Sequence, residues 1–331
     1  MSDVLTFGEA MVRLSPPNFQ RIEQTATLDM SAGGAEYNVA AGVTRFGLSA
    51  SWVSRMPDNP LGWFVRNQVR LFGVDTSHVV WTKEDRMGLY WVEFGASPRP
   101  PSVLYDRTGS AMSRIRPGEV NWRAAFEGAK LFHCSGITPA LSDSAAEVTL
   151  EALRMAKAAG LTVSWDPNYR SKLWTIDRAR SVQTPMMEHV DCFITGMGAA
   201  GEPEEAVFGI RGKTPLDVAR KLADRFGFDV VAVTVRGSSS MLRNTLTAFA
   251  WADGREFATR TYDLEIIDRV GGGDSFTAGF IWGYLQGDIQ TALDYGTAFS
   301  ALKHTILGDL NWATLEEVEE AVRGGGRSIS R

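Results

Sequence analysis

From about residue 125 onward, short apolar runs alternate with longer segments whose apolar residues recur at helical spacing. Such alternation is typical of βα units that build a mostly parallel sheet. The unbroken apolarity of FDVVAVTV (228–235) indicates a strand covered on both faces. The predicted strands lie at 130–137, 161–168, 192–195 and 228–235, and the predicted helices at 144–160 and 215–227.

The first third of the chain follows a different pattern, in which apolar and polar residues alternate. The segments MGLYWVEF (87–94) and SVLYDR (102–107) are separated by the proline-rich SPRPP and predict exposed antiparallel strands of a small flap. A helix is predicted to start at the glycine pair of GGAEYNVAAGVTRFG, and TAFAWADGREFATRTY predicts a hairpin with an Asp-Gly turn. We expect one domain, 1–331, with a β lid built from roughly 10–30 and 86–113.

The composition excludes several classes of protein. The 331 residues are 44% hydrophobic and carry a net charge of −5, without a basic block that would attract nucleic acid or an anionic membrane. No apolar run is long enough to span a bilayer, and the N-terminus lacks a signal-peptide pattern. Cys134 and Cys192 lie in apolar stretches without CxxC spacing, which predicts buried thiols in a reducing compartment. We therefore expect a cytoplasmic protein with neither nucleic acid nor membrane as a partner.

Three consecutive glycines and an aspartate, GGGD (271–274), stand directly before a long apolar helical run. Three glycines in a row indicate a backbone that approaches a ligand closely or adopts angles that other residues avoid. A helix N-terminus presents unpaired N–H donors and a positive dipole end, which suit a phosphate. The alternative is an ordinary loop in which Asp274 is the helix N-cap. Capping alone does not explain three glycines, so the pattern favours a phosphate site.

The stretch DRVGGGDSFTAGF resembles a signature of the PfkB, or ribokinase-like, family of carbohydrate kinases, and SAGGAEYNVAAGVTRFG resembles the family's other signature. Within the family, LYDRTGSAMSRI, DPNYRSKLW and LKHTILGDLNWATLEEVE look most like the branch that phosphorylates 2-keto-3-deoxygluconate. The resemblance implies a three-layer α/β/α sandwich with a mostly parallel sheet and a small β lid. It also implies a sugar acid and ATP as ligands and Mg²⁺ as a cofactor. The resemblance leaves open whether a monovalent cation also binds.

The resemblance further implies a role for individual residues. Asp274 matches the base that accepts the proton of the attacking hydroxyl, and Gly271, Gly272 and Gly273 match the anion hole for the transferred phosphoryl group. The positions that match sugar contacts are Gly34, Asn38, Tyr90, Tyr105, Arg107, Arg170, Asp274 and Asp309. The positions that match nucleotide-phosphate contacts are Thr234, Arg236, Gly237, Gly271 and Gly273.

Each of these positions has a simpler alternative. The two tyrosines could be cross-strand aromatic residues, and the two arginines could be solvated surface charges. Asn38 could be an exposed helix position, Asp309 a turn residue and Thr234 a residue that fills a strand. Two arginines at strand ends nevertheless suit a carboxylate, which a guanidinium binds through two parallel hydrogen bonds. The sequence therefore favours a sugar acid over a neutral sugar such as fructose.

One departure from the family concerns magnesium. The family's Asn-x-x-Glu segment, expected after the strand at 192–195, is replaced here by TGMGAAGEPEEAVFG, which contains no asparagine. Glu202 or Glu205 could supply the carboxylate through water, since Mg²⁺ commonly keeps several of its waters. The metal ligands stay unassigned, and a sugar- or nucleotide-binding sensor without turnover is an alternative to the kinase. Exposed flap strands also favour a homo-oligomer, a dimer or higher, that forms by pairing of sheet edges.

Overall fold

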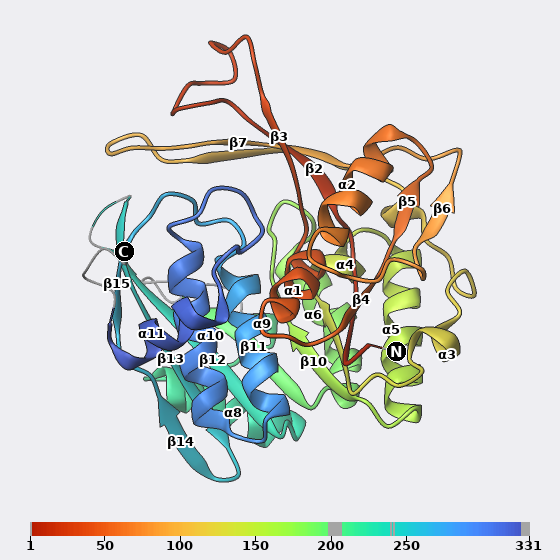
Figure 1. The fold of residues 1–331 in the computed structure, drawn as a ribbon. Coiled ribbons are helices and arrows are strands. Elements are labelled where there is room, and N and C mark those ends of the chain that lie inside the picture. Colours follow the sequence, from red (N-terminus) through yellow and green to blue (C-terminus); the bar gives the residue numbers. More distant parts are fainter. Residues whose placement is uncertain (1, 198–206, 239, 241, 326–331) are drawn as a thin grey trace.

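A large, mostly parallel sheet forms the centre of the computed structural model, which describes residues 2–197, 207–238, 240 and 242–325 (Figure 1). The strand order is β14-β13-β12-β11-β10-β9-β1-β4, and β15 pairs with β13. From β12 to β4 all neighbouring strands are parallel, whereas β13, β14 and β15 add antiparallel pairs at one edge. The strands are β1 (Val4–Phe7), β4 (Ala50–Val53), β9 (Leu131–Ser135), β10 (Thr162–Asp166), β11 (Cys192–Met197), β12 (Val230–Ser238), β13 (Arg243–Ala252), β14 (Arg255–Ala258) and β15 (Tyr262–Glu265).

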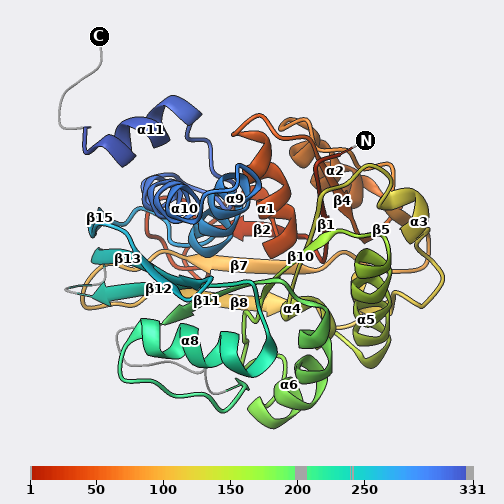
Figure 2. The same cartoon turned by 90° about the horizontal axis from the view of Figure 1, so that it is seen from below.

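Helices cover both faces of this sheet, so the predicted three-layer α/β/α architecture is confirmed (Figure 2). Adjacent strand residues face opposite layers, as Leu131 and Phe132 do by packing in different core clusters. One layer contains α1 (Ala35–Thr44), α2 (Pro60–Arg70), α9 (Gly272–Leu285), α10 (Ile289–Lys303) and α11 (Leu315–Arg323). The other contains α5 (Asp143–Ala158), α6 (Ile176–Gln183) and α8 (Pro215–Phe226). Short helical turns are α3 (Trp122–Ala125), α4 (Ile137–Ala140), η1 (Met112–Arg114) and η2 (Thr184–His189).

A second, four-stranded sheet projects from the end of the central sheet and corresponds to the predicted small β lid (Figure 1). Its order is β3-β2-β7-β8. The pairs β2–β3 and β7–β8 are antiparallel, but the two central strands, β2 and β7, run parallel. The predicted antiparallel strands in 87–94 and 102–107 are confirmed as β7 and β8. The parallel pair β2–β7 was not predicted; its strands are joined by a long crossover and not by a hairpin. The lid strands are β2 (Met11–Ser15), β3 (Asp29–Gly33), β7 (Leu89–Glu93) and β8 (Ser102–Asp106), and β5 (Arg55–Pro57) pairs separately with β6 (Val80–Thr82).

Local sequence signals account for several element boundaries. Helix α8 begins at an N-cap, Thr214, whose hydroxyl accepts from the amide of Asp217, and it ends at Gly227 in the left-handed region. The β13–β14 hairpin turns at Asp253 and Gly254, which both have positive φ, as the Asp-Gly signal predicts. Within the described residues, no helix combines the length and the apolarity that a membrane span requires.

Candidate active site

A cavity of about 950 Å³ lies between the lid and the carboxyl ends of the parallel strands. Open α/β sheets bind their ligands at this end of the strands. Of the predicted site residues that the structure describes, only Gly237 is absent from the cavity wall. The predicted residues that line it are Gly34, Asn38, Tyr90, Tyr105, Arg107, Arg170, Thr234, Arg236, Gly271, Gly272, Gly273, Asp274 and Asp309.

The glycine loop leads directly into α9, which begins three residues earlier than an N-cap at Asp274 would require. Gly271 is the N-cap, with φ of 82° in the left-handed region, and Asp274 lies in the first helical turn. The alternative of Asp274 as a capping residue is therefore wrong. The first helical hydrogen bond runs from the amide of Ser275 to the carbonyl of Gly271, at 2.9 Å. The amides of Gly273 and Asp274 therefore precede the hydrogen-bonded part of the helix. They lie at the helix N-terminus, where the helix dipole favours anions.

The three glycines are required for different reasons. A Cβ on Gly271 would overlap the carbonyl oxygen of Asp309, and a Cβ on Gly272 would overlap the ring of His304. A Cβ on Gly273 would meet only Nη2 of Arg236, at 3.7 Å. Two of the glycines are therefore explained by packing, and only Gly273 leaves open space in front of the helix N-terminus.

Asp274 has the environment expected of a general base. Its Oδ2 accepts a hydrogen bond of 2.6 Å from Nδ2 of Asn38, which lies on α1. Burial raises the pKa of the Asp274 carboxyl to about 7, although the hydrogen bond from Asn38 lowers it. Asp309 and Glu36 raise this pKa further, whereas Arg170 lowers it. A pKa near neutrality suits proton transfer at physiological pH, because the carboxylate is then both present and basic.

The lid contributes two stacked tyrosines to the cavity. Tyr90 on β7 and Tyr105 on β8 stand directly opposite each other, with ring centroids 5.9 Å apart and an interplanar angle of 20°. The hydroxyl of Tyr90 donates to Oδ2 of Asp309 at 2.6 Å. The tyrosines are therefore a cross-strand pair as well as part of the cavity wall.

The two predicted arginines differ in their surroundings. Arg107 forms an ion pair with Glu9, which is 3% exposed and also accepts from the hydroxyl of Ser110. Glu9 therefore supplies Arg107 with an anionic partner even without a sugar acid. Arg170 follows β10 and is exposed at the cavity wall.

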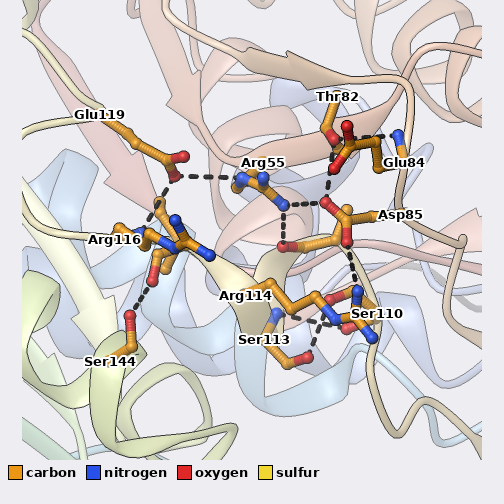
Figure 3. A network of polar contacts seen from close by, with 12 residues as sticks. Arg55, Thr82, Glu84, Asp85, Ser110, Ser113, Arg114, Arg116, Glu119 and Ser144 are labelled. Carbon is orange, nitrogen blue, oxygen red and sulfur yellow. Dashed lines mark hydrogen bonds and ion pairs between the residues drawn. The ribbon is translucent and has the colours of Figure 1, made fainter.

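A network of charged side chains holds the foot of the β7–β8 hairpin (Figure 3). Asp85, just before β7, lies between Arg55 of β5 and Arg114 after β8. Arg55 also contacts Glu119 at 3.1 Å and donates to the carbonyl of Ala111 at 3.0 Å. The segment that follows Arg107 is thereby fixed to the body of the protein.

Sequence reasoning predicted Asp309 as a sugar contact but missed the buried charges that lie with it behind the glycine loop. Arg13 of β2 contacts Asp268 at 2.6 Å and Asp309 at 2.7 Å. Lys303, at the end of α10, donates to the carbonyl oxygens of Asp268 at 3.4 Å and Ile306 at 2.9 Å. The available signal was a charged residue inside an otherwise apolar segment, as in MVRLS of β2.

The residues predicted to contact nucleotide phosphates have fewer described contacts than those predicted to contact the sugar. The hydroxyl of Thr234 donates to the carbonyl of Thr195 at 3.4 Å, and Gly237 pairs with Thr245 across β12 and β13. Gly237 is thus explained by strand pairing. The magnesium candidates Glu202 and Glu205 lie outside the described residues. Within the described ranges, no group of three or more His, Cys, Asp or Glu side chains is arranged to hold a metal ion.

Comparisons with known proteins agree on one family. The model of the pfkB family carbohydrate kinases matches residues 1–311. A 2-dehydro-3-deoxygalactonokinase from Haloferax volcanii is 40% identical over 331 residues, which are 100% of this chain and 99% of that protein. A 2-dehydro-3-deoxygluconokinase from Bacillus subtilis is 30% identical over 312 residues, 93% of this chain and 91% of that protein.

The fold leads to the same family. The solved structure of a 2-dehydro-3-deoxygluconokinase from Thermotoga maritima superimposes with a TM-score of 0.93 at 40% identity, covering 97% of this chain and 98% of that one. A ribokinase-like enzyme from E. coli has a TM-score of 0.83 at 21% identity, which shows the ribokinase-like fold. Because the family model covers residues 1–311 and the similar relatives each cover at least 93% of the chain, the chain belongs to the pfkB family of carbohydrate kinases.

Proposed function

We propose that the protein transfers the γ-phosphoryl group of ATP to a hydroxyl group of a 2-keto-3-deoxy sugar acid, with Asp274 as the general base. The observation that carries the proposal is the position of Asp274, held by Asn38 at the mouth of the glycine loop and with a pKa of about 7. The names of the relatives from Haloferax volcanii, Bacillus subtilis and Thermotoga maritima support a keto-deoxy acid as the acceptor.

The proposed reaction uses the residues as follows. The substrate hydroxyl oxygen forms a bond to the γ-phosphorus while the bond to the β-phosphate oxygen breaks, and the hydroxyl proton passes to Oδ of Asp274. ADP leaves, and the phosphorylated acid carries the new ester. The amides near Gly273 would stabilise the charge of the transferred group, which in phosphoryl transfer matters more than base strength. The lid would exclude water, a competing acceptor.

ATP fits the described residues better than its metal does. The cavity offers a helix N-terminus and the side chains of Thr234 and Arg236 for phosphates. Mg²⁺ typically uses one or two carboxylates and takes its other ligands from phosphates and water, so it needs no cage of protein ligands. When bound with ATP, it would neutralise phosphate charge. The monovalent cation stays a prediction; the ammonium of Lys303 already sits between two backbone carbonyls behind the loop.

We propose Arg170 and Arg107 as the groups that recognise the substrate carboxylate. Both residues line the same cavity as Asp274. A charged hydrogen bond contributes about 1.5–3 kcal/mol, so removing one should reduce kcat/KM for the acid by about one to two orders of magnitude. Arg170→Ala is the cleaner test, because Arg107→Ala would also leave the buried Glu9 without its cation.

The test is a coupled ADP-release assay with 2-keto-3-deoxygluconate, its C4 epimer 2-keto-3-deoxygalactonate, and fructose. We expect the wild type to prefer the acids, and Arg170→Ala and Arg107→Ala to lose rate on the acids more than on fructose. Arg154→Ala, exposed on α5 and remote from the cavity wall, is the control and should keep wild-type rates. A wild type that favours fructose would assign the protein to the neutral-sugar branch, and binding without ADP release would support a sensor.

Two further properties stay predictions of this proposal: a cytoplasmic location and a homo-oligomer. The edge strands of the lid, β3 and β8, carry the exposed side chains of Met30 and Leu104. Apolar residues on a sheet edge favour pairing with another strand. These residues therefore support self-association through the lid.

A further inference from the structure

Lys303, the last residue of α10, is completely buried, with 0% of its surface exposed. Lysine is rarely buried, because its ammonium group loses hydration that other groups must replace. Here Nζ donates to the carbonyl oxygens of Ile306 at 2.9 Å and Asp268 at 3.4 Å. Backbone carbonyl oxygens are also the groups that replace the hydration shell of K⁺ in proteins. The ammonium of Lys303 therefore has surroundings that would suit a monovalent cation.

The two carbonyl groups belong to segments that hold the glycine loop from both sides. Asp268 lies just before Gly271, and its Oδ2 accepts from the amide of Gly308 at 3.0 Å. Ile306 lies in the turn that leads from α10 to Asp309, and the carbonyl oxygen of Asp309 leaves no room for a Cβ on Gly271. The ammonium therefore fastens the segment that enters the loop to the turn that packs against it.

The same ammonium balances the buried charge behind the loop. Arg13 contacts two carboxylates, those of Asp268 at 2.6 Å and Asp309 at 2.7 Å, and can neutralise only one of them. Lys303 supplies the second positive charge. Burial lowers the pKa of its ammonium, whereas Asp268 and Asp309 raise it. Without this lysine, a net negative charge would remain buried behind a loop that has to receive phosphates, which is unfavourable for both.

We propose that the ammonium of Lys303 is a built-in replacement for a monovalent cation, so that the protein turns over without added K⁺, and that loss of this ammonium creates a site for such an ion. The ammonium group and K⁺ are similar in size and carry the same charge, so either can satisfy the two carbonyl oxygens, but not both together. Lys303 acts through the backbone and is a positioning residue. This inference rests on the proposed function, because it takes the glycine loop as the phosphate site.

The first measurement is made on the wild type. The ADP-release assay is run at constant Mg²⁺ in choline chloride, NaCl, KCl or NH₄Cl, each at about 100 mM so that ionic screening is equal. We expect kcat to be the same in all four salts, because the cation site is already filled by the protein. A wild type that K⁺ or NH₄⁺ activates severalfold over choline would overturn the proposal.

The second measurement uses Lys303→Met. The methionine side chain is one atom shorter than lysine, so it keeps the apolar stem and removes the ammonium from the two carbonyl oxygens. In choline chloride its kcat should be at least about tenfold below wild type. KCl and NH₄Cl should restore a large part of that loss, and choline should not. Its melting temperature should also rise by about 1–3 °C in KCl relative to choline chloride, because an ion that binds only the folded state stabilises it.

Lys157→Met is the matched control. Lys157 lies on α5 in the other helical layer and forms an ion pair with Asp191 at 2.6 Å. This variant should keep the wild-type kcat, and its melting temperature should not respond to K⁺ more than that of the wild type. A response of Lys303→Met that Lys157→Met shares would be an effect of salt on any lost lysine.

The remaining outcomes also decide. A folded Lys303→Met protein whose kcat and melting temperature are equal in all four salts would show that Lys303 is only a structural residue. If the variant folds in none of the salts, the wild-type comparison decides alone. If the wild type releases no ADP with any of the sugars, the proposed function fails, and the melting temperatures of the wild type and Lys303→Met still test the cation site.

Discussion

Asp274→Asn separates a catalytic role of this carboxylate from a structural one. Asparagine has nearly the shape of aspartate, and its oxygen can still accept from Nδ2 of Asn38. It cannot accept the substrate proton. The substitution should also spare α9, because the N-cap of the helix is Gly271 and not Asp274.

The size of the effect follows from the pKa of about 7. At pH 8 about nine-tenths of the wild-type carboxylate is ionised, and loss of a general base typically costs about 10²- to 10⁴-fold in rate. We expect kcat of Asp274→Asn to be at least about 100-fold below wild type at pH 8. Below pH 7 the wild-type rate should itself fall about tenfold per pH unit, so the difference between the two proteins narrows.

Stability should change in the opposite direction to activity. The folded-state pKa lies above the ordinary value of 3.8, so between about pH 4 and pH 7 the folded protein keeps a proton that the unfolded chain has lost. The free energy of unfolding therefore falls as the pH rises from about 4 to about 7, and the stability that the protonated Asp274 contributes is fully lost above the folded-state pKa. Neutral asparagine avoids that loss, and the variant should melt at or above the wild-type temperature at pH 8.

The assay combines steady-state kcat from about pH 5 to about pH 9 with thermal melting at pH 8. A variant that keeps more than about a tenth of the wild-type kcat at pH 8 would refute the general-base role. A variant that melts well below the wild type would show that the carboxylate stabilises the folded loop and that its burial carries no cost.

Two further predictions concern the neighbours of this carboxylate. Asn38→Ala removes the donor that lowers the pKa of Asp274. A charged hydrogen bond contributes about 1.5–3 kcal/mol, so the acid limb of the plot of kcat against pH should move up by about one to two pH units. An acid limb that does not move would contradict the pairing of Asn38 with Asp274. Gly273→Val should lower kcat about 10²- to 10³-fold with little change in melting temperature, because its side chain enters the open space in front of the helix. Gly272→Val should instead lower the melting temperature, because the ring of His304 occupies the space that the new side chain would need. Equal effects of the two variants on melting temperature and on kcat would show that both glycines only serve packing.

Sequence reasoning succeeded where the determining information is local. The alternation of strands and helices follows from periodicities of about two and 3.6 residues, which depend on neighbouring positions alone. Caps and turns such as Thr214, Gly227 and the Asp253–Gly254 pair act within one turn of chain. Cys134 and Cys192 are free thiols and are buried, as the apolar segments around them predict.

The amino-acid sequence by itself determined the fold class, the family and the position of the glycine loop, because these rest on local patterns and on two separated signatures. Only the tertiary structure decided which glycine leaves open space in front of the helix, because a Cβ on Gly271 or Gly272 would meet Asp309 or His304 from other parts of the chain. The same holds for Arg13, which meets carboxylates 255 and 296 residues away. Periodicity assigns a side chain to a face of its own element, but packing of distant elements selects its partner, and with it the pKa and the chemistry of the site.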